Sequence, residues 1–374
     1  MAGKYTLYIF CILFILPGAL PAQDKWAGVG IESNFMAGKI YRHSKKFPVQ
    51  LPDMVTSYEL NAVFQTYGTK DWQQRRNYPL VGFGFMYTNY GIDSIYGKCF
   101  SIYPNLQLPI LKYKNFEWTF KAGFGLGYVT RQYERSPSFD TINTAIGSGF
   151  NNFSLFATDI RYRVNKHLDV QIGGSFSHTS NAAFRTPNLG INTYGAHIGI
   201  RYFPTTSQPE KIKKELTPLK NRWTGNLRVG LAAREAPSPD GPMYPIYIIS
   251  AFAGKRYWSK NKAFIGLDYS YHTNMYAFLR NNEILVGEER ANSWKSAVII
   301  GNEFMMGRVG LVMQLGFYVK NYAIPEDFFY QKLGGNVYLW QKEEGILKEA
   351  SAFIMMKTHK FDAELVEVGI GVGF

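Results

Sequence analysis

Apolar and polar residues alternate along most of this chain with the period of two that a β-strand with one buried face requires. In the last segment, Glu364 to Phe374, every second residue from Val366 onward is apolar, and the residues between them are Glu367 and three glycines. The same alternation recurs in three earlier segments, 223–231, 263–272 and 308–317. This period predicts a protein built almost wholly of β-strands.

The alternation predicts about sixteen strands, with boundaries uncertain by a few residues. A break from Thr205 to Asn221, rich in Lys, Glu and Pro, divides them into two halves, and a short helix is expected in it from Glu210 to Leu216. The strands are expected at 26–38, 55–69, 79–90, 98–110, 115–131, 151–163, 168–181, 191–203, 222–235, 244–257, 262–277, 292–305, 308–321, 330–342, 347–358 and 361–374.

The strands favour a membrane barrel over a soluble sandwich, because their apolar faces repeat along the whole chain. After residue 22 no apolar run reaches the ~18 residues of a transmembrane helix, and strands cross a bilayer only as a closed barrel. The opposite faces carry glycines and polar residues such as Arg228 and Asp268, as a barrel lumen does. We therefore predict an all-β, transmembrane antiparallel β-barrel. We prefer one barrel of about 14–16 strands, and the alternative is an eight-stranded barrel followed by a second β unit.

The first residues have the composition of a secretory signal. Lys4 precedes a short apolar run, and Pro17 to Ala22 offers small residues for cleavage. Cleavage would leave Cys99 without an intrachain disulfide partner. The expected division of the chain is a signal peptide, a first β half, a periplasmic linker and a second β half: 1–22, 23–203, 204–221 and 222–374. Both chain ends are expected in the periplasm, so odd-numbered strands run outward.

Composition and charge fit a membrane surface better than a nucleic acid. Aromatic residues make up 16% of the chain, which suits a protein that lines two membrane–water interfaces. The net charge is +13, but the basic residues are scattered and form no nucleic-acid motif. An anionic outer leaflet would attract such loops, and loop solubility alone is the other interpretation.

The segment 177–192 carries the candidate chemistry. His178 and Ser180 share the parity of the apolar residues Val170 and Ile172, so we expect both side chains on the lipid-facing wall. Two residues along a strand rise about 6.6 Å, which lets an imidazole lean over a hydroxyl. Polar groups facing hydrocarbon are costly unless they are paired. We therefore expect Ser180 to act as nucleophile and His178 as its general base.

Asn192 is the expected third member of this group. It lies at the same rim, on the apolar parity of the next strand, where it would orient the imidazole of His178. An active site on the outer wall implies a lipid substrate that diffuses sideways to the barrel.

This segment also resembles the signature of the lipid A 3-O-deacylase family of outer-membrane barrels, in the motif His178-x-Ser180-Asn181 followed by Pro187-Asn188-x-Gly190. The resemblance implies that His178 and Ser180 are catalytic, that Asn181 and Asn188 contribute to the oxyanion hole, and that no metal or other cofactor is needed. The family has Glu where this chain has Asn192. An amide fixes a histidine tautomer but stabilises an imidazolium less than a carboxylate does.

The resemblance covers about residues 23–203, and the tail from Lys357 to Phe374 resembles that of longer acyloxyacyl hydrolase-like barrels of Bacteroidetes. It implies a Gram-negative outer membrane, lipid A of lipopolysaccharide as substrate and hydrolysis of an ester-linked acyl chain, with the 3-O position favoured. The terminal Phe374 resembles the signal read by the barrel-assembly machinery. Asn192 and the added second half motivate a second hypothesis, a non-enzymatic barrel that is porin-like or an inactive relative.

The other histidines are expected to be structural. His197 falls on a lumen face, and Asp268 and His272 share another, where a hydrogen-bonded pair is expected. His359 is expected in a solvated turn. No Cys and His spacing fits a zinc site.

Overall fold

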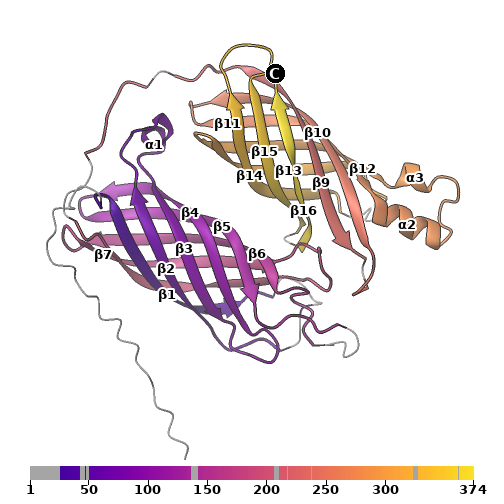
Figure 1. The fold of residues 1–374 in the computed structure, drawn as a ribbon, viewed down its shortest axis with the longest axis horizontal. Helices are drawn as coiled ribbons and strands as arrows, with labels where there is room; N and C mark the ends of the chain where they lie inside the picture. Colours follow the sequence, from indigo (N-terminus) through magenta and orange to yellow (C-terminus); the bar gives the residue numbers. More distant parts are fainter. Residues whose placement is uncertain are drawn as a thin grey trace, which may run out of the picture.

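Sixteen strands form two closed antiparallel barrels within the residues that the computed structural model describes, which are 26–42, 47, 50–135, 142–205, 210–216, 218–236, 238–322, 327–360 and 362–374. Figure 1 shows the first barrel in indigo to magenta and the second in orange to yellow. The expected signal peptide, residues 1–22, lies outside the described residues.

The first barrel closes where its last strand pairs with its first, from Ile31 opposite Tyr202 to Ile40 opposite Thr193. A short helix, α1 (Asp71–Arg75), lies in the connection between its second and third strands. The strands are β1 (Val29–Ile40), β2 (Val55–Gln65), β3 (Leu80–Asn89), β4 (Lys98–Tyr113), β5 (Phe116–Val129), β6 (Phe150–Arg163), β7 (Leu168–Ser180) and β8 (Ile191–Tyr202).

The second barrel closes in the same way, from Glu367 opposite Ala232 to Gly373 opposite Asn226. Two helices, α2 (Thr273–Asn281) and α3 (Glu289–Asn292), connect its third and fourth strands. The strands are β9 (Trp223–Glu235), β10 (Met243–Tyr257), β11 (Asn261–His272), β12 (Trp294–Met306), β13 (Val309–Lys320), β14 (Phe329–Gln341), β15 (Glu349–His359) and β16 (Asp362–Gly373). No helix among the described residues is long and apolar enough to cross a membrane.

The single barrel that we preferred is wrong, and the alternative, an eight-stranded barrel followed by a second β unit, is the arrangement present. Each half uses both of its sheet edges to close on itself, so neither edge remains for the other half. The alternation could not show this, because it reports which face a residue occupies and not which strands pair.

The expected helix from Glu210 to Leu216 is also wrong, because this part of the linker is irregular. The backbone N–H of Ile212 donates to the carbonyl of Tyr67 at 2.7 Å, and its carbonyl accepts from the hydroxyl of Tyr78 at 3.0 Å. These bonds to the connection between β2 and β3 replace those that a helix would make within itself.

Polar side chains fill the lumens, while apolar side chains cover the outer walls. In β7 the outward Ile172 is 59% exposed and the inward Gln171 is 5% exposed. In the first barrel the buried Lys121 donates to Glu32 at 2.5 Å and to Glu59 at 3.0 Å. The walls thus have the polarity expected of a barrel whose outside faces lipid.

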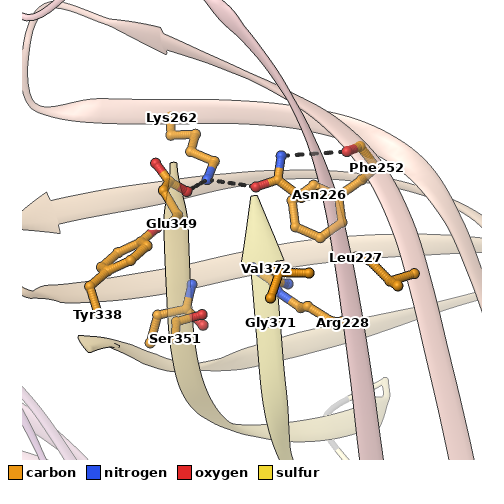
Figure 2. Close-up of a pocket in the computed structure, with 11 residues that line it drawn as sticks. Asn226, Leu227, Arg228, Phe252, Lys262, Tyr338, Glu349, Ser351, Gly371 and Val372 are labelled. Carbon is orange, nitrogen blue, oxygen red and sulfur yellow. Dashed lines mark hydrogen bonds and ion pairs between the residues drawn. The ribbon is translucent and has the colours of Figure 1, made fainter. Parts of the chain in front are cut away.

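The second lumen is packed in the same manner. Figure 2 shows Lys262 between Glu349, at 2.5 Å, and Asn226, at 3.1 Å. The cavity beside them has about 10 Å³, which is roughly the room of one water molecule. Deeper in the lumen, Lys332 bridges Asp268 and Glu367 at 2.7 and 3.0 Å.

Of the three other histidines with a predicted environment, His197 lies in the lumen as expected and two differ from the prediction. His197 Nε2 lies 2.6 Å from the buried Asp159 carboxylate in the first lumen. The expected pairing of His272 with Asp268 is wrong, because His272 contacts Ser270 at 3.0 Å. The expected solvated turn at His359 is also wrong, because this residue ends β15 and Nε2 of its mostly buried ring lies 2.9 Å from the hydroxyl of Tyr318.

The two barrels touch through side chains beyond both ends of their walls. After α1, Arg76 donates to the carbonyl of Lys260 at 2.5 Å and to the side chain of Asn261 at 2.9 Å. Beyond the opposite ends of the walls, Glu235 of β9 accepts from Arg135 and from Thr186 of the first barrel. Hydrogen bonds at two separated points fix one barrel against the other.

Candidate active site

The candidate residues lie where β7 ends and β8 begins. His178 and Ser180 close β7, and Asn192 lies directly opposite His178 in the register of β7 and β8. They have the same parity as the exposed Val170 and Ile172, which face away from the lumen. The structure therefore places all three on the outward parity that the alternation predicted.

These side chains are nevertheless covered, so the expected direct contact with hydrocarbon is wrong. Ser180 has no exposed surface, and His178 and Asn192 are 7% and 3% exposed. The cover includes residues 181–190, the connection between β7 and β8, here called the site loop. The site loop is itself held by the segment before β6, since the N–H of Gly190 donates to the carbonyl of Ala145 at 2.9 Å.

Gly190 brings the site loop against both candidate residues. Its φ is +78°, a conformation that favours glycine. A Cβ at this position would lie 3.1 Å from Cε1 of His178 and 3.3 Å from Cβ of Ser180. The imidazole and the hydroxymethyl group therefore both lie beside Gly190, where a Cβ would make tight contacts in a strained backbone conformation.

Asn192 holds the ring of His178. Nδ1 of His178 lies 2.6 Å from Oδ1 of Asn192. Because an amide oxygen can only accept, Nδ1 donates its proton in this bond, and Nε2 is then the basic nitrogen of the neutral ring. This is the tautomer that a general base beside a serine needs.

Two donors converge on the hydroxyl of Ser180. The side-chain amide of Asn188 donates to Oγ at 2.8 Å, and the backbone N–H of Ala182 donates to the same oxygen at 3.0 Å. Donors grouped beside a nucleophile can bind the negative oxygen that forms after its attack. Asn188 therefore contacts Ser180, and its role in an oxyanion hole stays a prediction, while Ala182 is a second donor that the sequence did not reveal.

Asn181, the residue after Ser180, hydrogen-bonds to other parts of the site loop and to Ser148. Its backbone N–H donates to Oδ1 of Asn188 at 3.2 Å, and its side-chain amide donates to Ser148 at 2.8 Å. Its Oδ1 accepts the N–H of Arg185 at 3.2 Å. Asn181 thus orients Asn188 and ties the site loop to the segment before β6, and its contribution to an oxyanion hole stays a prediction.

Two polar residues of β6 lie beside His178 and Ser180 on the outward parity, and the sequence analysis did not single them out. Ser154 lies opposite His178, and Asn152 lies opposite Ser180. The side-chain amide of Asn152 donates to the hydroxyl of Ser154 at 3.2 Å. Their signal was present in the sequence, because both interrupt the apolar parity of β6 just as His178 interrupts that of β7. In the described parts of the chain, no three His, Cys, Asp or Glu side chains are grouped as metal ligands are.

The fold and this site together define a protein with two β-barrels and a serine–histidine–asparagine group on the outward parity of one wall. Residues 56–201, from β2 to β8, match the family described as lipid A 3-O-deacylase (PagL). Residues 221–374, the whole second barrel, match the acyloxyacyl hydrolase C-terminal domain. The first barrel is thus similar to the lipid A 3-O-deacylase (PagL) family, and the second barrel is similar to the acyloxyacyl hydrolase C-terminal domain.

Solved structures similar to this chain include other barrels. Neisserial surface protein A (NspA) is 11% identical with a TM-score of 0.34, over 47% of this chain and 97% of that one. The outer membrane enzyme PagL is 15% identical with a TM-score of 0.32, over 45% of this chain and 97% of that one. CdiB from Acinetobacter baumannii is 11% identical with a TM-score of 0.18, over 93% of this chain and 60% of that one. No curated protein matches the chain.

Proposed function

We propose that this protein is an ester hydrolase of the Gram-negative outer membrane that removes an acyl chain from lipid A, with the 3-O-linked chain as the favoured target. The observation that carries the proposal is the grouping at the end of β7, where Asn192 orients His178 and two donors converge on Ser180. The match of residues 56–201 to the deacylase family supports the same chemistry.

The chemistry follows the two-step course of serine esterases. Oγ of Ser180 attacks the ester carbonyl while Nε2 of His178 takes its proton. The amide of Asn188 and the N–H of Ala182 bind the tetrahedral oxyanion. The intermediate collapses when His178 returns the proton to the departing sugar oxygen. A water molecule, deprotonated by His178, then attacks the acyl–Ser180 ester, and His178 returns that proton to Oγ of Ser180 as the fatty acid leaves.

The wall below the site suits a lipid chain. Ile160, Ile172 and Ile198 lie opposite one another on β6, β7 and β8, and each is at least 58% exposed. With the N-terminal end of β1 in the periplasm, β7 runs outward and its end reaches the leaflet that contains lipid A. We propose that the acyl chain lies along this wall and that Phe374 directs assembly of the barrels in that membrane.

Access to the nucleophile requires movement of its cover. Ser180 is fully buried, so an ester carbonyl can reach Oγ only if part of the site loop shifts outward. We expect the substrate to take the place of the bonds that Oγ accepts from Asn188 and Ala182, which would then bind the substrate's own oxygen.

The decisive experiment replaces the nucleophile. The variant Ser180→Ala should leave the barrels folded and abolish loss of an acyl chain from lipid A, read by mass spectrometry of cells that produce each form. Ser177→Ala is the matched control, because Ser177 is another buried serine of β7, 8% exposed, that faces the lumen and contacts Thr193. Identical lipid A from wild type, S180A and cells without the protein would refute the proposal.

The second candidate, an inactive relative, is favoured by one observation, the amide of Asn192 in place of the family's carboxylate. A porin-like role has less support, because buried ion pairs such as Lys121 with Glu32 occupy the first lumen. Conductance in planar bilayers without esterase activity would favour this candidate over the hydrolase.

A further inference from the structure

The site loop that supplies both donors to Ser180 is also held by the second barrel. Glu235, the last residue of β9, has no exposed surface. Its carboxylate accepts the backbone N–H of Thr186 at 2.5 Å, the hydroxyl of Thr186 at 3.1 Å and the guanidinium of Arg185 at 3.0 Å. Its backbone N–H donates to the carbonyl of Ala183 at 3.0 Å. One residue of the second barrel thus binds three residues of the site loop.

The part of the loop that reaches Ser180 has a conformation that needs external support. Ala182 and Ala183 have φ values of 50° and 59°, in the left-handed region that residues with a side chain seldom adopt. Such backbone persists only where the surroundings hold it in place. Ala182 donates to Ser180, and the carbonyl of Ala183 is held by Glu235. The contact between barrels therefore falls one residue from an oxyanion donor.

Arginine side chains extend this contact to the rest of the cover. Arg135, in the segment after β5, donates to Glu235 at 2.9 Å and to the carbonyl of Thr186 at 2.9 Å. Burial lowers the pKa of Arg135, but its hydrogen bonds to Glu235 and Asp240 outweigh burial and leave that pKa above its usual value. The guanidinium therefore stays charged beside the Glu235 carboxylate.

We propose that Glu235 is a positioning residue, through which the second barrel holds the site loop so that Asn188 and Ala182 reach Ser180. Glu235 touches no candidate catalytic side chain and acts only through residues 183–186 of the loop. This inference rests on the proposed function and adds to it a role for the second barrel, as the support of the catalytic loop of the first. Loop opening for substrate would then loosen the bonds to Glu235.

Kinetics of the full-length protein in outer-membrane vesicles test this inference. Glu235→Gln removes the charge at constant size and should lower kcat about tenfold to a hundredfold with little change in KM, because a donor displaced by about 1 Å loses catalytic power on that scale. The matched control is Glu349→Gln, which removes an equally buried carboxylate that pairs with Lys262 and Arg256 inside the second barrel. Unchanged kcat in folded E235Q would overturn the proposal.

A second variant separates positioning from general destabilisation. Thr186→Val keeps Glu235 but removes the hydroxyl that bonds to it and to the carbonyl of Ala236. If both residues act through one loop conformation, the double variant should lose less kcat than the product of the fold losses of E235Q and T186V. Independent, multiplying losses would contradict a shared mechanism.

Hydrogen exchange distinguishes failure of this inference from failure of the proposed function. The backbone amides of residues 182–186 and 188 should exchange at least tenfold faster in E235Q than in wild type, and at the wild-type rate in E349Q. Unchanged exchange in E235Q would overturn the positioning role of Glu235 even if the enzyme is active. Faster exchange in a protein that never deacylates lipid A would support the positioning role of Glu235 and refute the proposed hydrolase function.

Discussion

At the scale of single residues, one amide stands where the family has a carboxylate. Asn192 accepts the Nδ1 proton of His178 at 2.6 Å, so the ring is oriented although the partner carries no charge. Orientation and charge are separate contributions, because the first fixes the tautomer and the second stabilises the imidazolium that forms in the transition state. Asn192 supplies the orientation of the ring but not the charge.

Restoring the carboxylate should therefore raise the rate. We expect Asn192→Glu to increase kcat about tenfold, which corresponds to ~1.4 kcal/mol of added transition-state stabilisation. Deacylation of purified lipid A, followed over time, measures the change. Asn192→Gln is the control, because it has the length of Glu without the charge. An N192E protein no faster than wild type would show that charge at this position does not limit the reaction.

At the scale of elements, two strands and the loop between them make the site. β7 and β8 fix the spacing of His178 and Asn192 by register, whereas the site loop, held by its neighbours, positions the donors to Ser180. Gly190 joins the two, because its backbone packs on His178 and Ser180 at a positive φ. The site loop therefore packs closely on β7 at Gly190, where a Cβ would make tight contacts.

A methyl group at this junction should disturb activity more than folding. Gly190→Ala adds a Cβ at 3.1 Å from His178 and 3.3 Å from Ser180, in a backbone conformation that costs an alanine about 1 kcal/mol. We expect at least a tenfold loss of kcat, measured on the folded protein. Gly174→Ala in β7 is the matched control, since its Cβ would meet only the carbonyl of Gly195 at 3.8 Å. Equal activity of the two variants would contradict this account.

At the scale of the whole molecule, buried charges hold each barrel together from inside. Lys121 is 1% exposed and links Glu32 on β1 with Glu59 on β2 from its position on β5. Removing one partner of such a group leaves buried charge uncompensated, which costs about 3–5 kcal/mol. A solvent-exposed pair such as Lys98 with Asp93 contributes about 1 kcal/mol or less.

The lumen network should therefore dominate barrel stability. We expect Lys121→Met to lower the free energy of unfolding by about 3–5 kcal/mol and Lys98→Met by less than about 1 kcal/mol. Urea unfolding in detergent, followed by tryptophan fluorescence, measures both. A K121M barrel as stable as K98M would show that the network contributes specificity instead of stability.

The sequence alone determined the strands and the side of the wall on which each residue lies. All sixteen expected strands are present with small shifts at their ends, except that the segment 262–277 leaves the sheet at His272 and continues as α2. It also singled out His178, Ser180, Asn188 and Asn192, because polar residues on an apolar parity are conspicuous and their motif resembles a known family. These features are local, since the pleat of the backbone alone sets the period of two.

Only the tertiary structure decided how the strands close, what covers the site and what holds the cover. Two barrels form instead of one, the site loop buries Ser180, and Glu235 reaches that loop from the other barrel. Each of these outcomes depends on pairing between residues far apart in the chain. Alternation fixes the face that a side chain occupies, but the partner it meets there is set by strand closure and by the docking of one barrel on the other.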